Sequence, residues 1–324
     1  MTRLFAKLLI TDHSSLLTRD ALSGTLSANA ERGMAHKRRP ILGIFAIGLL
    51  FFLYRVFTVY TVRSGECRPR DERPSFTEPF PPRTGFPKQT RPLLVMSYNI
   101  AGHDELYDGD HIQKIAAVIN RAKPDIVALQ EVHRGTWQAR FRDQLRELEV
   151  ATGMHGAFGK SYAQWGGAFG DALLTRGDIL SAEVHELPSV GEPRVLVEST
   201  IRIDNATIDF YVTHLTTWGK YNRSSRREQL LCLARHVKTS GRPYILAGDF
   251  NAPPDTPELI EFRKQNVAQL CGETIGDTHP LLHERIDYIW ADYGWDVRSA
   301  RLIAEGPSDH WPVIAELFWN RGAR

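Results

Sequence analysis

Carboxylate, amide and imidazole side chains follow or begin short apolar segments at six places in this sequence. They lie in the motifs SYNI, LQEV, THL, GDFNAPPD, RIDYIW and SDHWPV, and the residues are Asn99, Glu131, His214, Asp249, Asn251, Asp287, Asp309 and His310. Burying any one of these carboxylates without a partner would be costly. One shared site that receives all of these side chains is therefore the simplest explanation.

The residue types indicate a divalent cation. Asn99, Glu131 and Asp309 offer hard oxygen ligands, or supports for them, and such ligands favour Mg²⁺, Mn²⁺ or Ca²⁺. His214 and His310 are residues that can transfer protons near neutral pH. We therefore expect a site that holds Mg²⁺ (or Mn²⁺) beside two histidines.

The remaining groups indicate hydrolysis of a phosphorus ester. Asp249 and Asn251 can hold and polarise a water molecule, and Asp287 can accept a hydrogen bond that fixes the ring of His310. A cation and histidines stabilise the charge that grows on phosphoryl oxygens when water attacks. Each motif alone also has a structural interpretation, because GDFN fits a plain turn and SDH fits a cap-like turn. The ordered series of six motifs favours the catalytic interpretation.

The apolar segments predict a mixed α/β domain. The expected strands are 93–98, 125–130, 171–175, 180–187, 194–203, 206–213, 243–247, 285–290, 297–304 and 312–318, and the expected helices are 111–122, 138–152 and 224–238. The first strand, helix and strand form a crossover unit, and the short connections between 171 and 213 indicate antiparallel pairing. Such a domain is too large for one open sheet, so we expect two packed sheets.

The first 92 residues differ in composition from the rest. They hold 15 Lys/Arg and 7 Asp/Glu, a net charge of +8, whereas residues 93–324 hold 25 and 31, a net charge of −6. The apolar run 41–62 would form a helix about 33 Å long at ~1.5 Å per residue, enough for a hydrocarbon core of about 30 Å. We therefore expect a single-pass transmembrane anchor at 41–62, although Arg55 interrupts it.

The charges around this run predict its orientation. Lys37, Arg38 and Arg39 precede it, so residues 1–40 are expected to form a basic cytoplasmic tail and the body to lie outside the cytoplasm. A cleaved signal peptide and a buried helix of a soluble domain are alternatives for the same segment. Translation from Met34, which would leave 1–33 untranslated, is a further alternative.

The rest of the chain divides into a linker and one catalytic body. Residues 63–92 carry seven prolines and predict an extended proline-rich linker, so the compact domain is expected at 93–324. Its mildly acidic charge weakly disfavours nonspecific binding to a nucleic-acid backbone. The three cysteines form no CxxC pair, so a zinc or thioredoxin-like site is unsupported, and a disulfide between Cys232 and Cys271 stays open.

The six motifs together resemble the endonuclease/exonuclease/phosphatase superfamily, which includes deoxyribonucleases, sphingomyelinases and inositol phosphatases. The resemblance covers residues 93–318 and implies a four-layer α/β/β/α sandwich of two mixed sheets with the site at one edge. The segments GGAFGDALLTR and EPRVLVESTIRI are also similar to the ElsH-like branch of metal-dependent hydrolases.

The resemblance implies a role for each site residue. Asn99 and Glu131 correspond to the metal-site pair, His214 to a histidine that contacts phosphate, Asp249 and Asn251 to the water-orienting pair and Asp287 to the partner of His310, while Asp309 and His310 close the site and Asp171 stands at a phosphate-contacting position. The repair-endonuclease branch has an acidic residue where Ala101 stands and Tyr where His214 stands. Both departures favour the deoxyribonuclease and sphingomyelinase side.

Substrate clues in the sequence are weaker. Lys220, Arg223, Arg226 and Arg227 follow the His214 segment and suit a phosphate head group, with Arg226 as the expected contact, but a solvated helix start explains them equally well. We expect a metal-dependent phosphoesterase that acts on a lipid head group or a similar phosphoester near a membrane. The alternatives are an exported endonuclease that acts on DNA or RNA and an inactive binding module. No obligate protein partner is inferred.

Overall fold

The computed structural model describes residues 63–64, 89, 91–103, 109–204, 206–217 and 222–319. The predicted anchor at 41–62, the basic tail and most of the linker lie outside these residues, so those predictions are not tested. Within the described ranges, no helix has the length and apolar character needed to cross a bilayer.

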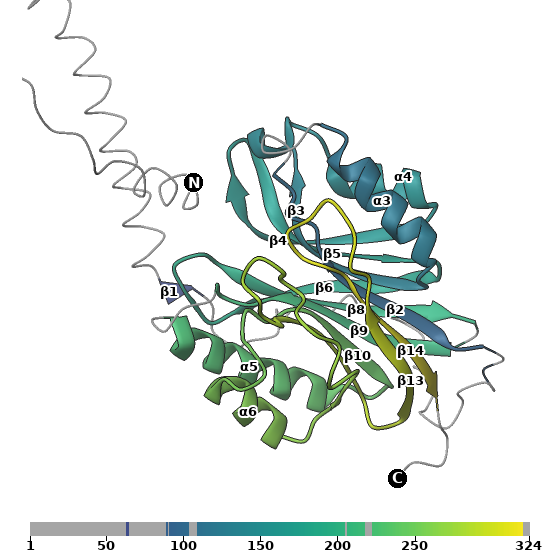
Figure 1. Cartoon of the computed structure of the whole chain (residues 1–324). Coiled ribbons are helices and arrows are strands. Elements are labelled where there is room, and N and C mark those ends of the chain that lie inside the picture. Colours follow the sequence, from purple (N-terminus) through teal and green to yellow (C-terminus); the bar gives the residue numbers. More distant parts are fainter. Residues whose placement is uncertain are drawn as a thin grey trace, which may run out of the picture. The chain divides into compact units, whose positions relative to one another are not determined.

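The first of two mixed sheets contains the N-terminal strands of the domain (Figure 1). In order across the sheet, its described strands are β13 (Trp295–Leu302), β14 (Val313–Trp319), β2 (Leu93–Asn99), β3 (Ile126–Arg134), β5 (Gly167–Thr175) and β4 (His155–Gln164). The β2–β3 pair is parallel and is connected by helix α3 (His111–Ala122), as the sequence predicted. The other neighbours pair antiparallel.

The second mixed sheet repeats this arrangement. In order, its described strands are β11 (Gln269–Leu270), β12 (Asp287–Ala291), β10 (Tyr244–Asp249), β9 (Ala206–His214), β8 (Arg194–Ile203) and β6 (Asp178–Leu187). Its parallel pair is β9–β10, connected by helix α5 (Arg223–Thr239). A separate antiparallel pair joins β1 (Arg63–Ser64) to β7 (Ser189–Val190).

Three apolar clusters hold four layers together. The central cluster lies between the sheets, where Val95 and Leu173 of one sheet meet Val197 and Phe210 of the other. The outer clusters pack helices α3 and α4 (Gln144–Thr152) on the first sheet and helices α5 and α6 (Pro257–Lys264) on the second (Figure 1). The domain is therefore an α/β fold with two mixed sheets between helical layers, as predicted.

Some boundaries differ from the sequence prediction. The helix expected at 138–152 begins only at Gln144, after a short 3₁₀ turn η3 (Trp137–Ala139). Arg140 and Phe141 adopt left-handed backbone conformations, which break the helix, and the Asp143 carboxylate then caps α4 by accepting from the Arg146 N–H. Strand β4 and helix α6 were not predicted. Cys271 is free and buried, so no disulfide joins it to Cys232.

Candidate active site

The carboxyl ends of the parallel strands from both sheets meet at one edge of the sandwich. Strand β2 ends at Asn99, β9 ends at His214 and β10 ends at Asp249. A hydrogen bond from Asn99 Nδ2 to Asp249 Oδ2, 3.1 Å long, connects the first sheet to the second. The structure therefore brings together polar residues that lie 150 positions apart in the sequence.

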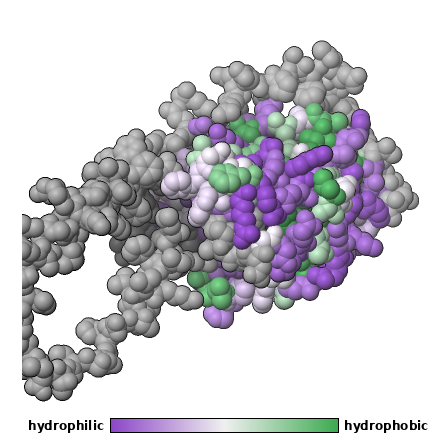
Figure 2. All heavy atoms as spheres, turned by 90° about the horizontal axis from the view of Figure 1, so that it is seen from above, coloured by the Kyte–Doolittle hydropathy of each residue, from purple (hydrophilic) through white to green (hydrophobic). Residues whose placement is uncertain are grey.

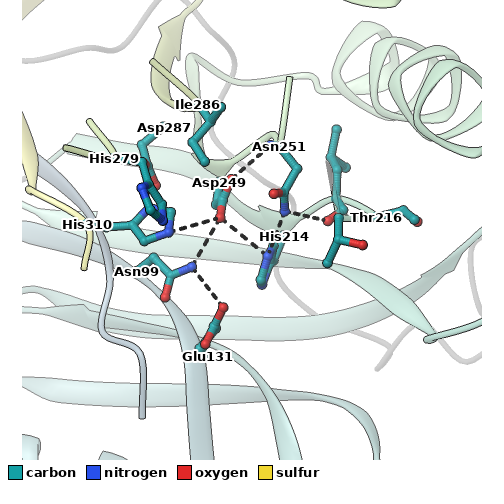
Figure 3. A network of polar contacts seen from close by, with 12 residues as sticks. Asn99, Glu131, His214, Thr216, Asp249, Asn251, His279, Ile286, Asp287 and His310 are labelled. Atoms are coloured by element: carbon teal, nitrogen blue, oxygen red, sulfur yellow. Dashed lines mark hydrogen bonds and ion pairs between the residues drawn. The ribbon is translucent and has the colours of Figure 1, made fainter. Parts of the chain in front are cut away.

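Asp249 lies at the centre of this network (Figure 3). Its Oδ2 atom accepts from Asn99 and lies 3.4 Å from His214 Nε2 and 3.9 Å from His310 Nε2. Its Oδ1 atom accepts from the backbone N–H of Asn251 at 2.8 Å. One buried carboxylate thus contacts an amide and faces two imidazoles, which is the environment of a group that handles protons.

His310 is held by Asp287, as the sequence predicted. The His310 Nδ1–H donates to Asp287 Oδ2 over 2.8 Å, which leaves Nε2 facing Asp249 (Figure 3). The preceding loop is fixed by Ser308, whose hydroxyl donates to the Asn99 carbonyl and accepts from the His310 backbone N–H. The orientation of the His310 ring is therefore set by contacts with both sheets.

The surroundings of Asp249 and His310 shift the pKa values of both side chains, which suits Asp249 as a base and His310 as an acid. Burial and the charge of Asp287 raise the pKa of Asp249 to about 7. Burial alone would lower the pKa of His310, but the charge and hydrogen bond of Asp287, with the charges of Asp249 and Asp309, outweigh it and raise that pKa to about 10. Carboxyl and imidazole groups whose pKa values are shifted in this way are typical of sites for acid–base chemistry.

His214 is held as a neutral ring. The Asn251 Nδ2 amide donates to His214 Nε2 and to the Leu215 carbonyl, each over 3.0 Å, so the ring proton lies on Nδ1. Burial and the charges of Arg194 and His310 lower the pKa of His214 well below its usual value. Its Nδ1 atom has no hydrogen-bond partner among the described residues. This N–H is available to donate to an oxygen of a bound ligand.

Asn99 also connects this network to Glu131, whose Oε1 atom accepts from Asn99 Nδ2 at 3.2 Å (Figure 3). Glu131 lies at a bulge of β3 and has a left-handed backbone conformation with φ 61°. For a residue other than glycine such a conformation costs about 1–3 kcal/mol. The fold accepts this strain where it places a carboxylate beside Asn99.

The donors present here fit a divalent cation. Charge from Glu131 and Asp249 raises the pKa of Asp171, and charge from Asp287 raises that of Asp249, after burial in both cases. Glu131, Asp249 and Asp287 bring carboxyl oxygens into this network, and Asn99 adds an amide oxygen. Hard oxygen donors of this kind suit Mg²⁺ or Mn²⁺.

The structure places the other predicted residues as follows. Asp309 Oδ2 lies 3.6 Å from Nε2 of His279, whose ring stacks edge-on against His310. Arg226 is buried and binds Glu258 and the Thr217 carbonyl. It therefore supports the loop that follows His214, and its contact with substrate stays a prediction.

Two buried groups beside the site have unused hydrogen-bonding atoms. Both carboxyl oxygens of Asp171, and Nε and Nη1 of Arg194, find no partner among the described residues. Asp171 was a predicted site residue, whereas Arg194 was missed. The available signal was a lone arginine directly before the apolar run VLV in EPRVLV, which alternation alone does not distinguish from a solvated residue.

Comparisons with known proteins agree with this geometry. Residues 96–310 match the endonuclease/exonuclease/phosphatase family. A family member from Beutenbergia cavernae is 25% identical with a TM-score of 0.62, and the match covers 72% of each chain. The catalytic domain of human Nocturnin with bound sulfate is 23% identical, with a TM-score of 0.58 and coverage of 74% of this chain and 100% of that one.

A mannosyl-6-phosphatase from Bacteroides thetaiotaomicron is 20% identical with a TM-score of 0.57, and the match covers 70% of this chain and all (100%) of that one. No curated protein matches the chain in sequence. Because the family match spans most of the chain and contains the site residues from Asn99 to His310, this chain belongs to the endonuclease/exonuclease/phosphatase family, whose members are phosphoester hydrolases.

Proposed function

We propose that this domain cleaves a phosphodiester or phosphomonoester bond of a substrate at a membrane surface, with a lipid head group as the leading candidate. The observation that carries the proposal is the position of Asp249 Oδ2, which accepts from Asn99 and faces His214 and His310. This arrangement places a proton acceptor between a neutral and a charged imidazole. It suits the activation of water beside a phosphate.

Asn99, Glu131 and Asp309 are the residues that would hold a divalent cation. When bound, such a cation supplies positive charge that polarises the phosphoryl group and offsets the nearby carboxylates. Mg²⁺ is the leading candidate and Mn²⁺ the second, because both take oxygen ligands.

The protein's own residues account for the proton transfers. The oxygen of a water molecule held by Asp249 and Asn251 attacks phosphorus, its proton moves to Asp249 Oδ2, and the bond from phosphorus to the ester oxygen breaks. The His310 Nε2–H gives its proton to the departing oxygen. Asp249 then returns a proton to His310 across the 3.9 Å that separates them, which restores both groups. His214 Nδ1 donates to a non-bridging oxygen and so stabilises its growing charge.

Location near a bilayer is supported by two features. The apolar run 41–62 predicts an anchor that keeps the body outside the cytoplasm, as a single-pass membrane protein. In addition, Trp137, Phe141 and Trp165 are 56%, 66% and 50% exposed, in the loops that follow β3 and precede β5. These loops lie at the end of β3 that carries Glu131. Exposed Trp and Phe side chains favour the interface between water and lipid.

The face of the domain in Figure 2 suits peripheral rather than deep contact with lipid. On the face in Figure 2, the coloured hydrophobic residues form small groups separated by hydrophilic ones. Single aromatic side chains, instead of a continuous apolar patch, would therefore meet the bilayer. Such contact would orient the site toward head groups without burying it.

A substrate screen tests the proposal. The purified full-length protein is assayed with Mg²⁺, with Mn²⁺ and with a chelator on phospholipid and sphingolipid vesicles, inositol phosphates and plasmid DNA, with His310→Ala as the inactive control. Cation-dependent release of a phosphorylated or dephosphorylated head group supports the lipid proposal. Vigorous nicking of DNA without lipid turnover would reject it in favour of a nuclease. Equal readings from wild type and His310→Ala in every assay would identify a binding module.

A further inference from the structure

Arg194 is a buried cation that the reaction above does not use. It begins strand β8, is 2% exposed, and its Nη2 atom lies 3.0 Å from Glu192 Oε1. Its Nε and Nη1 atoms have no hydrogen-bond partner among the described residues. Because a guanidinium carries five N–H donors and is costly to bury unless they are used, these free donors indicate a missing ligand.

The sheet register places Arg194 at the edge that carries the active site. Strand β8 runs antiparallel to β9, and Leu196 of β8 lies opposite Thr213 of β9. The first residue of β8 therefore lies beside the end of β9, where His214 stands. The electrostatics agree, because after burial the charge of Arg194 is the next cause that lowers the pKa of His214.

Asp171 of β5, which belongs to the other sheet, is a second buried group with unused atoms near Arg194. Both of its carboxyl oxygens are buried and unpartnered, and no hydrogen bond joins it to Arg194, although each group acts on the pKa of the other. Two buried polar groups that influence each other and do not bond to each other both keep atoms for a third group. Burial raises the pKa of Asp171 well above its usual value, so that side chain can donate an O–H.

Arg226 shows the contrast with a saturated arginine. It is also 2% exposed, but its Nε and Nη2 atoms donate to Glu258 at 3.1 and 2.8 Å, and Nη1 donates to the Thr217 carbonyl at 2.8 Å. Glu258 and the loop carbonyl thus take up a donor from each of its three nitrogens. Burial of an arginine alone therefore does not indicate a ligand site. The unused donors of Arg194 beside His214 do.

We propose that Arg194 forms the phosphate-binding subsite of this active site, in which Nε and Nη1 donate to two non-bridging oxygens of the substrate's phosphate group. Asp171 and His214 Nδ1 supply further donors around the same tetrahedral oxyanion. The inference rests on the proposed phosphoester hydrolysis and adds the residue that recognises the charged group. Arginine suits this task because its planar fork matches two phosphate oxygens at once.

Inorganic phosphate is the probe for the test. The Ki of phosphate as a competitive inhibitor and the KM for a chromogenic aryl phosphoester are measured for full-length wild type, Arg194→Gln and Arg194→Lys. We expect Arg194→Gln to raise both values roughly 10- to 100-fold, the loss typical of hydrogen bonds to charged groups. Arg194→Lys keeps the charge but loses the fork and is expected to raise them less.

Arg242→Gln is the matched control. Arg242 is a largely buried arginine that precedes strand β10, at the end opposite Asp249, and binds Asp209 at 2.7 Å and Thr200 at 3.0 Å. Its loss should lower the Tm without changing KM or Ki. If Arg194→Gln does not fold, Arg194→Lys decides, and the rise in Tm on adding phosphate gives a second readout that should shrink in the variant.

The outcomes separate this inference from the proposed function. An active wild type whose KM and phosphate Ki are unchanged by both Arg194 substitutions overturns the subsite. A wild type that binds no phosphate also overturns it. Phosphate binding that depends on Arg194 in a protein that cleaves no phosphoester would support the subsite and reject the reaction.

Discussion

Two groups of histidine and acidic side chains in this domain have similar composition but different surroundings. The first is Asp249, Asp287 and His310 at the strand ends, and the second is His185, Glu198 and His236 between β6, β8 and α5. In each, the three possible ligand atoms lie within 4.8 Å of one another. Residue type and proximity alone therefore do not distinguish a catalytic group from a structural one.

The difference lies in the carboxylates of each group and in what surrounds them. Glu198 accepts from His185 Nε2 at 2.7 Å and from the Tyr211 hydroxyl at 3.2 Å, so this carboxylate serves two donors, while His185 Nδ1 has no partner among the described residues. At the strand ends, two carboxylates repel each other, Asp287 keeps one oxygen unpartnered among the described residues, and Asp171 nearby keeps two. Unsatisfied atoms and opposed charges identify the site that awaits a cation and a phosphate.

The largest expected effect is the loss of the central carboxylate. Asp249→Asn keeps the size of the side chain but cannot take a proton from water, so we expect kcat to fall roughly 10²–10⁴-fold, the range for acid–base groups. Steady-state hydrolysis by the full-length protein measures this. Asp209→Asn is the control, because Asp209 is buried on the same β9–β10 pair and binds Thr200, Ser240 and Arg242 away from the site. A similar kcat loss in that variant would contradict a special role for Asp249.

Asp249→Asn is expected to raise the stability of the fold, although it lowers kcat. The pKa of Asp249 is raised to about 7, so the folded protein keeps a proton that the unfolded chain releases above its lower pKa. Stability is therefore lost as pH rises toward and through 7. In the absence of divalent cations at pH 8, Asp249→Asn should have a higher Tm than wild type. An equal or lower Tm would show that the carboxylate is not strained.

The next effect concerns the cation. Glu131→Gln removes a negative charge from the oxygen donors, and we expect the Mg²⁺ concentration for half-maximal activity to rise roughly 10- to 100-fold. Calorimetric titration of Mn²⁺ into the protein should show the same loss. Glu198→Gln in the other group is the control and should leave the Mg²⁺ requirement unchanged. A shift with Glu198→Gln and none with Glu131→Gln would exchange the roles of the two groups.

A smaller effect is expected from the residue that orients His310. Asp287→Asn weakens the 2.8 Å hydrogen bond to His310 Nδ1, so kcat should fall about tenfold while KM stays within about twofold, as for residues that position a reacting group. Asp292→Asn, at the other end of β12, replaces a carboxylate that accepts from the Gly294 N–H by a weaker amide acceptor and should lower only stability. A change in KM without a change in kcat would place Asp287 in substrate binding instead.

The spacing of apolar residues in the sequence predicted the helices and strands that bury one face at regular intervals. Helix α3 has the predicted bounds because Ile112, Ile115 and Ile119 form one buried stripe and Pro124 follows its end. Strand β4 at the sheet edge was missed because most of its residues are half-exposed or exposed and glycines interrupt it. Its Gly159 is required by tertiary packing, since a Cβ there would lie 2.2 Å from a Val197 methyl group.

The residues of the candidate site likewise include some that the sequence predicts and some that it does not. Asn99, His214 and Asp249 were predictable because each ends a strongly apolar strand, where a polar residue needs a reason. Arg194 begins its strand, and a charge at that position resembles a solvated boundary. Only the pairing of β8 with β9 shows that it is buried beside His214. The sequence thus indicates site residues whose polarity is unexpected at their position in a strand. Site residues whose polarity is ordinary at their position, such as Arg194, can be identified only from the folded structure.

The smallest effect on activity is expected in the second group, at His236. Burial, the charge of His185 and, more weakly, that of Arg235 lower the pKa of His236 to about 4, against an opposing effect of Glu198. Between about pH 6.5 and pH 4 the unfolded chain therefore binds a proton that the folded protein does not, and stability is lost as pH falls through that window. His236→Gln should keep wild-type kcat, and its Tm should fall less than that of wild type between pH 7 and pH 5.

Thermal denaturation at these two pH values, with activity measured on the same samples, tests this expectation. His155→Gln is the control, because His155 is exposed on strand β4 and its replacement should leave the wild-type change in Tm intact. If His236→Gln reduced kcat as far as Asp249→Asn does, the two groups would share a function and their comparison would fail. If it changed only the acid sensitivity of the fold, the group around Glu198 would be structural and the group around Asp249 catalytic.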